Sequence, residues 1–349
     1  MQVDYIIVGL GLAGLAFTKE LEENNKTFIV FENDSQNSSI VAGGMYNPVI
    51  LKRFTPVWNA VEQLKEAIPF YESLENRFKK KYNYPVDIYR IFKSVEEQNN
   101  WFAASDKPLL ANYMVSNVIH EKHEGILANY GFGKLINTGR IDTKSLLEDF
   151  KEYLLNKNVL NNESFEYSAL NISDNEVDYK GIKASKVVFC EGFGLKKNPF
   201  FSYLPMQEAK GELLTIKAAK LNVDFLIKAS VFVLPLGNNF YKVGATFNWK
   251  DKTSQPSEEG KQELIEKLNS FITVPYEIVE HSAGIRPTVK DRRPLLGTHP
   301  KHKNLAILNG LGTRGVMIAP MSSKVLYNYL ENNVEIDNDI SIDRYATLF

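Results

Sequence analysis

A glycine cluster near the start of the chain, Gly9-Leu10-Gly11-Leu12-Ala13-Gly14, constrains the fold more than any other feature. An apolar strand over residues 3–8 precedes it, and an amphipathic helix over 12–23 follows. A second strand is expected over 27–31. Strand, glycine turn, helix and strand in this order form the βαβ unit of a parallel sheet. The sequence therefore predicts a Rossmann-type unit that binds a dinucleotide.

Each glycine of this fingerprint has a distinct expected role. Gly9 permits the tight turn, Gly11 lets the backbone approach a pyrophosphate, and Gly14 lets the helix pack closely on the strand. The helix opens at Leu12 and Ala13, and its free amides and positive dipole end would face the phosphates.

An acidic residue, Glu32, closes the second strand, where a carboxylate is expected to accept hydrogen bonds from ribose hydroxyls. Its neighbour Asn33 is expected at the same site. Glu32 would repel a 2′-phosphate, which argues against NADP. The fingerprint alone leaves FAD and NAD both open.

The remaining pattern predicts an α/β fold with two domains. Helices are expected over 57–80, after Asp142 as N-cap, and over 257–271. Strands are expected over 86–92, 165–170, 176–179, 186–190, 211–217, 229–234, 239–245 and 276–283, with a hairpin turn at Gly237-Asn238-Asn239. We predict a discontinuous Rossmann-type dinucleotide-binding domain and a second, α+β domain with an antiparallel sheet. The segments are 1–85, 134–205 and 284–349 for the first domain, and 86–133 and 206–283 for the second.

Composition narrows the classes of protein. The 349 residues carry 41 Lys and Arg against 42 Asp and Glu, a net charge of −1, which argues against a dedicated nucleic-acid-binding role. The lone cysteine, Cys190, rules out an intrachain disulfide and favours a cytoplasmic protein. No apolar run approaches the ~20 residues that span a bilayer, and the first residues lack the basic region of a signal peptide. His120 and His123 lack a completing ligand motif, so no metal site is predicted.

Four further segments carry a resemblance to a known family. They are Ser38-Ser39-Ile40-Val41-Ala42-Gly43-Gly44-Met45-Tyr46-Asn47-Pro48, the stretch 187–194, Gly284-Ile285-Arg286-Pro287 followed by Asp291 and Pro294-Leu295-Leu296-Gly297, and Asn309-Gly310-Leu311-Gly312-Thr313-Arg314-Gly315-Val316-Met317-Ile318-Ala319-Pro320. Scattered over nearly the whole chain in this order, they resemble the D-amino-acid oxidase superfamily, which includes glycine oxidase, sarcosine oxidase and the oxidase half of the bifunctional tRNA methylaminomethyl-uridine enzyme.

The resemblance implies a cofactor, non-covalently bound FAD, and the residues that contact it. It implies that the backbone of the small-residue segment passes the flavin, that a loop after the 187–194 strand contacts the ADP part, and that a late glycine turn faces the flavin ring. The residues implied are Ala42, Gly43, Gly44 and Met45 in the first, Glu191 and Gly192 in the second, and Gly312, Thr313, Arg314, Gly315 and Val316 in the third.

Three residues are candidates for contact with the substrate. Arg286 resembles the family's arginine that clamps a substrate carboxylate, although an ion pair with Asp291 is an alternative. Arg314 is either a second anion contact or a surface charge. Phe232 stands where many relatives have a carboxylate-binding tyrosine, and it cannot donate a hydrogen bond; an ordinary core aromatic is the alternative.

The resemblance implies an FAD-dependent oxidoreductase that oxidises the C–N bond of a small amine or amino acid by hydride transfer to flavin N5. Dioxygen or another acceptor would reoxidise the flavin. Three alternatives stay open: a dehydrogenase that passes electrons to a quinone or a protein, an enzyme acting on a modified tRNA nucleoside, and a non-catalytic flavin-binding module.

Overall fold

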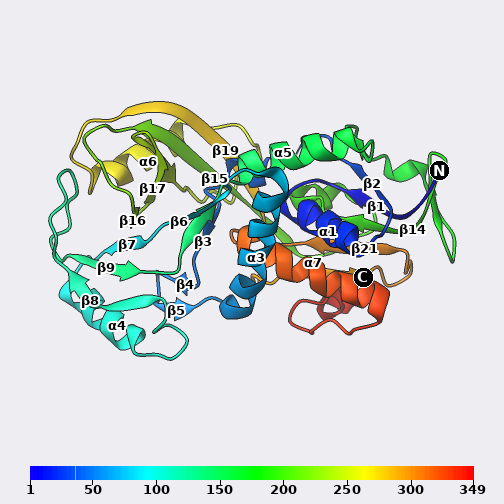
Figure 1. Ribbon diagram of the computed structural model, residues 1–349, viewed down its shortest axis with the longest axis horizontal. Helices are drawn as coiled ribbons and strands as arrows, with labels where there is room; N and C mark the ends of the chain where they lie inside the picture. Colours follow the sequence, from blue (N-terminus) through cyan, green and yellow to red (C-terminus); the bar gives the residue numbers. More distant parts are fainter. Residues whose placement is uncertain (36) are drawn as a thin grey trace.

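The computed structural model describes residues 1–35 and 37–349, and it places two large sheets at opposite ends of the molecule (Figure 1). Both chain termini lie in the half of the molecule that contains the first sheet. Within the described residues it has eight strands, with a parallel core ordered β11-β2-β1-β14-β21. The strands are β1 (Gln2–Val8), β2 (Phe28–Phe31), β11 (Leu160–Asn161), β12 (Leu170–Ile172), β13 (Val177–Tyr179), β14 (Ile182–Phe189), β20 (Leu295–Thr298) and β21 (Leu305–Asn309).

Helices cover one face of this parallel core. Tyr5 and Ile7 of β1 point toward them and are almost fully buried, whereas Ile6 and Val8 pack on the opposite face, as strand alternation requires. The covering helices are α1 (Leu12–Glu23), α5 (Thr143–Asn156) and α7 (Gly315–Asn332), and α3 (Ala60–Phe78) packs on α7. The predicted Rossmann-type unit is therefore confirmed, with α1 beginning and ending at the predicted residues.

The second sheet supplies the antiparallel half. Its order is β19-β15-β18-β17-β16-β7-β9-β8, and all neighbours are antiparallel except β16 and β7, which run parallel. The strands are β7 (Ile88–Ile91), β8 (Met114–Ile119), β9 (Phe132–Leu135), β15 (Met206–Lys217), β16 (Leu226–Lys228), β17 (Phe232–Gly237), β18 (Phe240–Gly244) and β19 (Glu277–Val289). Helices α4 (Val95–Ser105) and α6 (Glu258–Asn269) pack on it. The predicted α/β architecture with an antiparallel second sheet is confirmed.

Short elements join the two halves. In the part of the chain that the structure describes, two small sheets and one short helix lie between the large sheets, and three 3₁₀ turns lie elsewhere. They are α2 (Ser38–Val41), β3 (Met45–Tyr46), β4 (Val49–Ile50), β5 (Thr55–Pro56), β6 (Asn83–Pro85), β10 (Gly139–Ile141), η1 (Tyr167–Ala169), η2 (Gly192–Lys197) and η3 (Ile342–Leu348).

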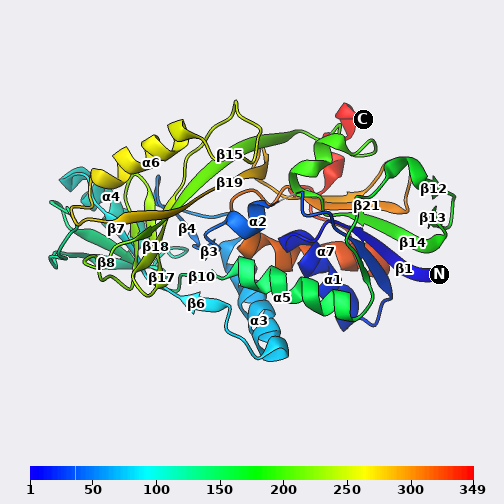
Figure 2. The ribbon, with the colours of Figure 1, turned by 90° about the horizontal axis from the view of Figure 1, so that it is seen from above.

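The longest strand pair, β15 and β19, extends from the antiparallel half toward the parallel half (Figure 2). The two strands pair from Met206 opposite Val289 to Lys217 opposite Glu277. β19 is continuous through residues 283 and 284, where the sequence predicts a domain boundary. The proposed division of the chain into two domains therefore cuts a strand at this point.

Three details of the prediction are wrong. Of the strand expected over 229–234, only residues 232–234 lie in a strand, β17. Residues 229–231 form the chain reversal between β16 and β17, in which the Ala229 amide donates to the Val231 carbonyl at 2.9 Å. The strand expected over 165–170 contains the 3₁₀ turn η1, and the Phe165 ring before this turn stacks on Tyr179 with the ring centroids 4.2 Å apart.

The third wrong detail is the buried face of α3, which differs from the apolar pattern in the sequence. Val61 is 47% exposed, whereas Gln63 is fully buried and donates to the Trp58 carbonyl at 2.7 Å. A buried polar amide, whose nitrogen donates but whose Oε1 has no partner in the described chain, therefore replaces an aliphatic side chain on this face.

Among residues 1–35 and 37–349, no helix is both long and apolar enough to cross a membrane. Within the same ranges, no three His, Cys, Asp or Glu side chains are grouped to hold a metal ion.

Candidate active site

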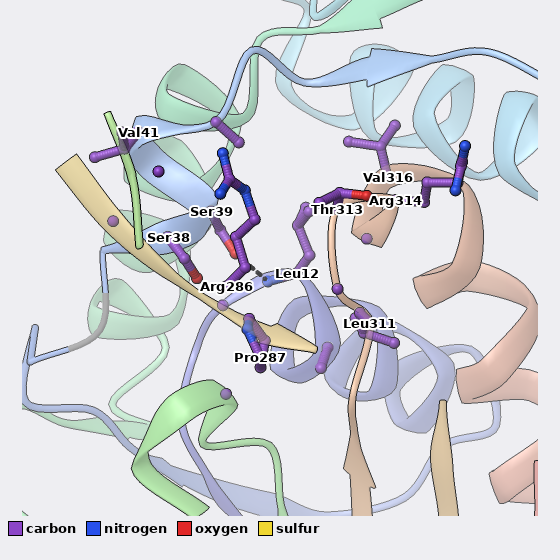
Figure 3. Close-up of a pocket in the computed structure, with 18 of the residues that line it drawn as sticks. Leu12, Ser38, Ser39, Val41, Arg286, Pro287, Leu311, Thr313, Arg314 and Val316 are labelled. Carbon is purple, nitrogen blue, oxygen red and sulfur yellow. Dashed lines mark hydrogen bonds between the residues drawn. The ribbon is translucent and has the colours of Figure 1, made fainter. Parts of the chain in front are cut away.

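A cavity of about 850 Å³ lies between the two sheets, and residues from both halves line it. Figure 3 shows Leu12 at the start of α1, Ser39 of α2 and Arg286 of β19 around this space. Its volume falls within the range of ligand and cofactor sites. The cavity is therefore the candidate site.

The glycine turn forms one wall of the cavity. Gly9 has φ +98°, and a Cβ there would approach the Cys190 carbonyl oxygen at 2.7 Å. A Cβ at Gly14 would overlap the Gly9 carbonyl, so Gly14 lets the helix lie on the turn without lining the cavity. A Cβ at Gly11 would meet only the Ser39 hydroxyl, at 3.3 Å. The protein itself therefore leaves the space in front of Gly11 open.

The N-terminus of α1 points its amides toward this open space. Gly11 has no side chain that could cap the helix. Among the first amides of α1, that of Leu12 donates to Ser39 Oγ at 3.3 Å, and this hydrogen bond is dashed in Figure 3. The first amides of a helix have no intrahelical acceptor. They suit an anionic group such as a pyrophosphate.

Glu32 closes the same wall at the end of β2. Its carboxylate accepts from the Leu10 amide, from Asn33 N at 2.9 Å and from Asp34 N at 2.7 Å. These amides fix the carboxylate beside the glycine turn, where Glu32 and Asn33 both line the cavity. Of the roughly four acceptor lone pairs of a carboxylate, about one remains for a ligand hydroxyl.

A second helix N-terminus, that of α7, meets the first. A Cβ at Gly315 would lie 3.2 Å from Leu12 Cδ1, so the two helix starts are in contact. Arg314 occupies the N-cap position without a side-chain cap, and the first intrahelical bonds begin at Met317 N and Ile318 N. The Gly315 and Val316 amides are left for a ligand, and a negative charge placed there would be stabilised by the dipole.

The small-residue segment 42–45 lines the cavity between the halves. Gly44 has φ +66°, and a Cβ there would overlap the Ile141 carbonyl. Lys242 supports the segment from behind by donating from Nζ to the Val41 carbonyl at 3.2 Å. Burial lowers the pKa of Lys242.

Glu191 lies beside the end of β14. Its carboxyl accepts from the Tyr167 hydroxyl and from Asn198 Nδ2, the latter at 2.7 Å. Burial raises the pKa of Glu191 to about 7. The adjacent Gly192 carbonyl accepts from Asn309 Nδ2 at 3.0 Å, which ties this loop to the end of β21.

Arg286 extends from β19 into the cavity. Its guanidinium lies over the Phe247 ring, 4.4 Å from the centroid, and donates to the Thr246 carbonyl at 3.3 Å from both Nη1 and Nη2. Burial lowers the pKa of Arg286 to about 10. Asp291, the alternative partner, instead accepts from Arg344 Nε at 2.9 Å. Among the described residues Arg286 has no carboxylate partner.

Arg314 also lines the cavity without a carboxylate partner in the described chain. Burial lowers its pKa, and the nearby Arg292 charge adds to that effect. In Figure 3 its side chain and that of Arg286 lie apart and extend from different elements. The two guanidinium groups therefore do not form one clamp.

Phe232 of β17 lines the cavity, although it is only 7% exposed. A Cβ at Gly43 would lie 3.5 Å from its Cζ, and one at Gly244 would lie 3.0 Å from it. The two glycines make room for the ring, so Phe232 shapes the wall beside the 42–45 segment.

The cavity gathers the predicted site residues from widely separated segments. All of them line it except Gly14; the lining members are Gly9, Gly11, Leu12, Ala13, Glu32, Asn33, Ala42, Gly43, Gly44, Met45, Glu191, Gly192, Phe232, Arg286, Gly312, Thr313, Arg314, Gly315 and Val316. Sequence analysis missed Gly211, Lys228 and Phe247, whose places depend on strand pairing. It also quoted Ser39 without assigning it a role.

The chemical groups on the cavity wall are those that a dinucleotide requires. Uncapped helix amides face open space at Gly11, and an acceptor carboxylate, Glu32, lies next to them. The N-terminus of α7 adds a second set of donors. A phosphate-bearing ligand with ribose hydroxyls matches this set of groups.

Comparisons with known proteins give the family. The family model described as FAD dependent oxidoreductase, DAO, matches residues 4–328. The tRNA 5-methylaminomethyl-2-thiouridine biosynthesis bifunctional protein of Marinobacter nauticus is 19% identical over 345 residues, covering 92% of this chain and 54% of that protein. The chain thus spans about half the length of this relative. Glycine oxidase of Bacillus licheniformis is 27% identical over 127 residues, 36% of this chain and 34% of that protein.

Solved structures share the fold. Glycine oxidase from Geobacillus kaustophilus superposes with a TM-score of 0.81 at 20% identity, covering 97% of each chain. Iminodiacetate oxidase from a Chelativorans species superposes with a TM-score of 0.80 at 15% identity, covering 97% of this chain and 99% of that one.

Proposed function

The chain belongs to the DAO family of FAD-dependent oxidoreductases, and we propose that it oxidises a carbon–nitrogen bond in a small amine or amino acid. The observation that carries this proposal is the position of Arg286. It lines the same cavity as the glycine turn and has no carboxylate partner in the described chain. A partly buried cation without a counterion suits an anionic substrate group.

The FAD-contacting roles follow from the groups on the cavity wall. The α1 amides at Leu12 and Ala13 would hold the pyrophosphate, and Glu32 would accept from the ribose. The α7 amides at Gly315 and Val316 would stabilise negative charge on the flavin pyrimidine. Segments 1–85, 134–205 and 284–349 would form the FAD-binding domain, and 86–133 and 206–283 the substrate domain.

FAD, when bound, accepts a hydride at N5 of its ring and is later reoxidised by dioxygen or another acceptor. Arg286 would hold the substrate carboxylate and so orient the C–H bond next to the nitrogen. The amine loses a hydride and a proton, and water then hydrolyses the imine to a carbonyl compound and an amine or ammonia.

The charges that line the antiparallel half of the cavity favour a substrate with an acidic group. Glu32, Glu163 and Glu191, the carboxylates among the described lining residues, all follow strands of the parallel sheet. No lining carboxylate of the antiparallel half, within the described chain, would oppose a substrate anion. Rate enhancement would then rest mainly on positioning and on charge complementarity.

The experiment is turnover of the FAD-loaded protein with paired substrates. Amino acids and secondary amines are compared with the corresponding 2-hydroxy acids, in air and with an artificial electron acceptor, and carbonyl and ammonia products are identified. The proposal expects carbonyl formation from the amines. Oxidation of the hydroxy acids with no reaction of the amines would refute it.

A second candidate is an amine on a modified tRNA nucleoside, as the name of the Marinobacter relative suggests. Phe247, which lines the cavity, and Trp249 are 49% and 48% exposed, with ring centroids 5.4 Å apart. Exposed aromatic rings can stack on unpaired bases. Oxidation of a modified tRNA but of no free amine would favour this candidate.

A further inference from the structure

Besides Arg286, another cation from a strand of the antiparallel sheet, Lys228, lines the cavity. It is the last residue of β16, and its register partners are Arg90 on β7 and Phe232 on β17. Paired residues on adjacent strands point to the same face of a sheet. Lys228 therefore lies between Arg90 and the Phe232 ring, with Leu226 and Ile88 also lining the cavity beside it.

The carboxylate that Arg90 contacts, Glu97, is already occupied. Glu97 Oε1 accepts from Arg90 Nη2 at 2.6 Å and from Nε at 3.2 Å, and its Oε2 accepts from Lys93 N at 2.7 Å. The side-chain ammonium of Lys228 makes no hydrogen bond or ion pair with any part of the chain that the structure describes. Its ammonium group is thus uncompensated within the protein.

The charge persists under ordinary conditions. Burial, with the neighbouring charges of Arg90, Lys267 and Lys93, lowers the pKa of Lys228 to about 8. Below that pH most molecules still carry the ammonium group. A partly buried cation of this kind is stabilised when a ligand supplies the counterion.

The distance from Arg286 sets the length of that ligand. β16 and β19 are separated by four strand spacings, because β17, β18 and β15 lie between them. At about 4.8 Å per spacing the two strands are roughly 19 Å apart along the sheet, and the two long side chains shorten the gap. Phe232 and Leu213 line the cavity between them. A glycine-sized molecule could not reach both cations.

We propose that Lys228 binds a second carboxylate, so that the substrate is an amine with one carboxylate next to the reacting carbon and another at the far end of an apolar chain. The proposal rests on the proposed function, because Arg286 is taken to hold the first carboxylate. Lys228 is then a specificity-determining residue, and its charge-assisted hydrogen bond selects diacids over monoacids.

The test uses binding without turnover. FAD-loaded wild-type protein is titrated with glutarate, adipate and suberate, and with the matching monocarboxylates, by calorimetry and by the change in flavin absorbance. Lys228→Met should weaken binding of the best diacid by about tenfold or more, the usual effect of a lost charge-assisted hydrogen bond. Its effect on monocarboxylate binding should stay within about twofold. Lys228→Arg should restore most of the diacid affinity.

A matched control is Lys93→Met, which removes an exposed cation near Lys228 but outside the cavity. It should leave diacid binding unchanged, and flavin content of each variant reports folding. Equal diacid binding by wild type and Lys228→Met would overturn the proposal. A variant that binds diacids normally but reduces its flavin more slowly would also overturn it, because Lys228 would then act as a base. Lys228-dependent diacid binding by a protein that oxidises no amine would retain this site and refute the proposed function instead.

Discussion

The guanidinium of Arg286 lies directly against the backbone of Gly211, so that a Cβ on Gly211 would overlap Nη2 and Cζ of the arginine. The two residues are neighbours on paired strands, since Gly211 is opposite Gly284 and Ala209 is opposite Arg286. Absence of a side chain at Gly211 thus lets Arg286 lie flat on β15, between that strand and the Phe247 ring.

Gly211→Ala should therefore displace the Arg286 guanidinium without unfolding the protein, because a flexible side chain can move aside. We expect KM for a carboxylate-bearing amine to rise about tenfold or more, with a smaller change in kcat. Gly237→Asn, at a hairpin turn where no atom lies within 4 Å, is the control and should leave both constants unchanged. An unchanged KM in Gly211→Ala would contradict this account of the contact.

Arg286→Met keeps the length of the side chain but removes its charge. Loss of hydrogen bonds to a charged group costs about 1.5–3 kcal/mol, so KM should rise roughly 10- to 150-fold for substrates with a carboxylate. Amines without a carboxylate should show little change. Steady-state kinetics on one substrate of each type makes the comparison, and an equal loss for both would indicate a structural role for Arg286.

Gly11→Val should prevent FAD binding while preserving the fold. The protein leaves the space before Gly11 open, so the valine methyl groups would occupy the expected pyrophosphate position. We expect FAD affinity to fall about 100-fold or more, measured by fluorescence titration of the apoprotein. The matched control is Gly181→Asn, in the turn between β13 and β14, where open space surrounds an added Cβ. By contrast, Gly14→Ala should destabilise the apoprotein itself, because its methyl group would overlap the Gly9 carbonyl.

Glu191 should make apoprotein stability depend on pH. Burial raises its pKa from an ordinary value of 4.5 to about 7, so between these values the folded protein holds a proton that the unfolded chain has released. This contribution to stability is fully present below pH 4.5 and is lost as pH rises through about 7. Urea denaturation of wild type and Glu191→Gln across this window tests the sign. Parallel curves for the two proteins would show that Glu191 does not contribute.

Local signals predicted the elements whose geometry neighbouring residues determine. The glycine turn fixes the start of α1, Asp142 caps α5 by accepting from Ser145 N at 3.2 Å, and Gly237-Asn238-Asn239 reverses the chain with three positive φ angles. Each of these depends on residues within one turn of the chain. Capping and turn preferences are therefore visible in sequence.

The positions of the cavity residues that were not predicted from the sequence depend on long-range strand pairing. Lys228 and Arg286 share a cavity only because strand order brings β16 and β19 into one sheet. The run Val231-Phe232-Val233-Leu234 has no turn residue to mark where β17 begins, so the chain reversal before it was not visible. The role of Gly211 likewise depends on which strand pairs with β15.

The most direct test of the central claim is an anaerobic absorbance titration of the FAD-loaded protein with amines and amino acids. Without oxygen the result does not depend on the electron acceptor. The account predicts bleaching of the oxidised-flavin band near ~450 nm, a property of the cofactor, with a carbonyl compound formed in equal amount to the reduced flavin. A flavin band that no amine bleaches, or a protein that binds NAD in place of FAD, would contradict it.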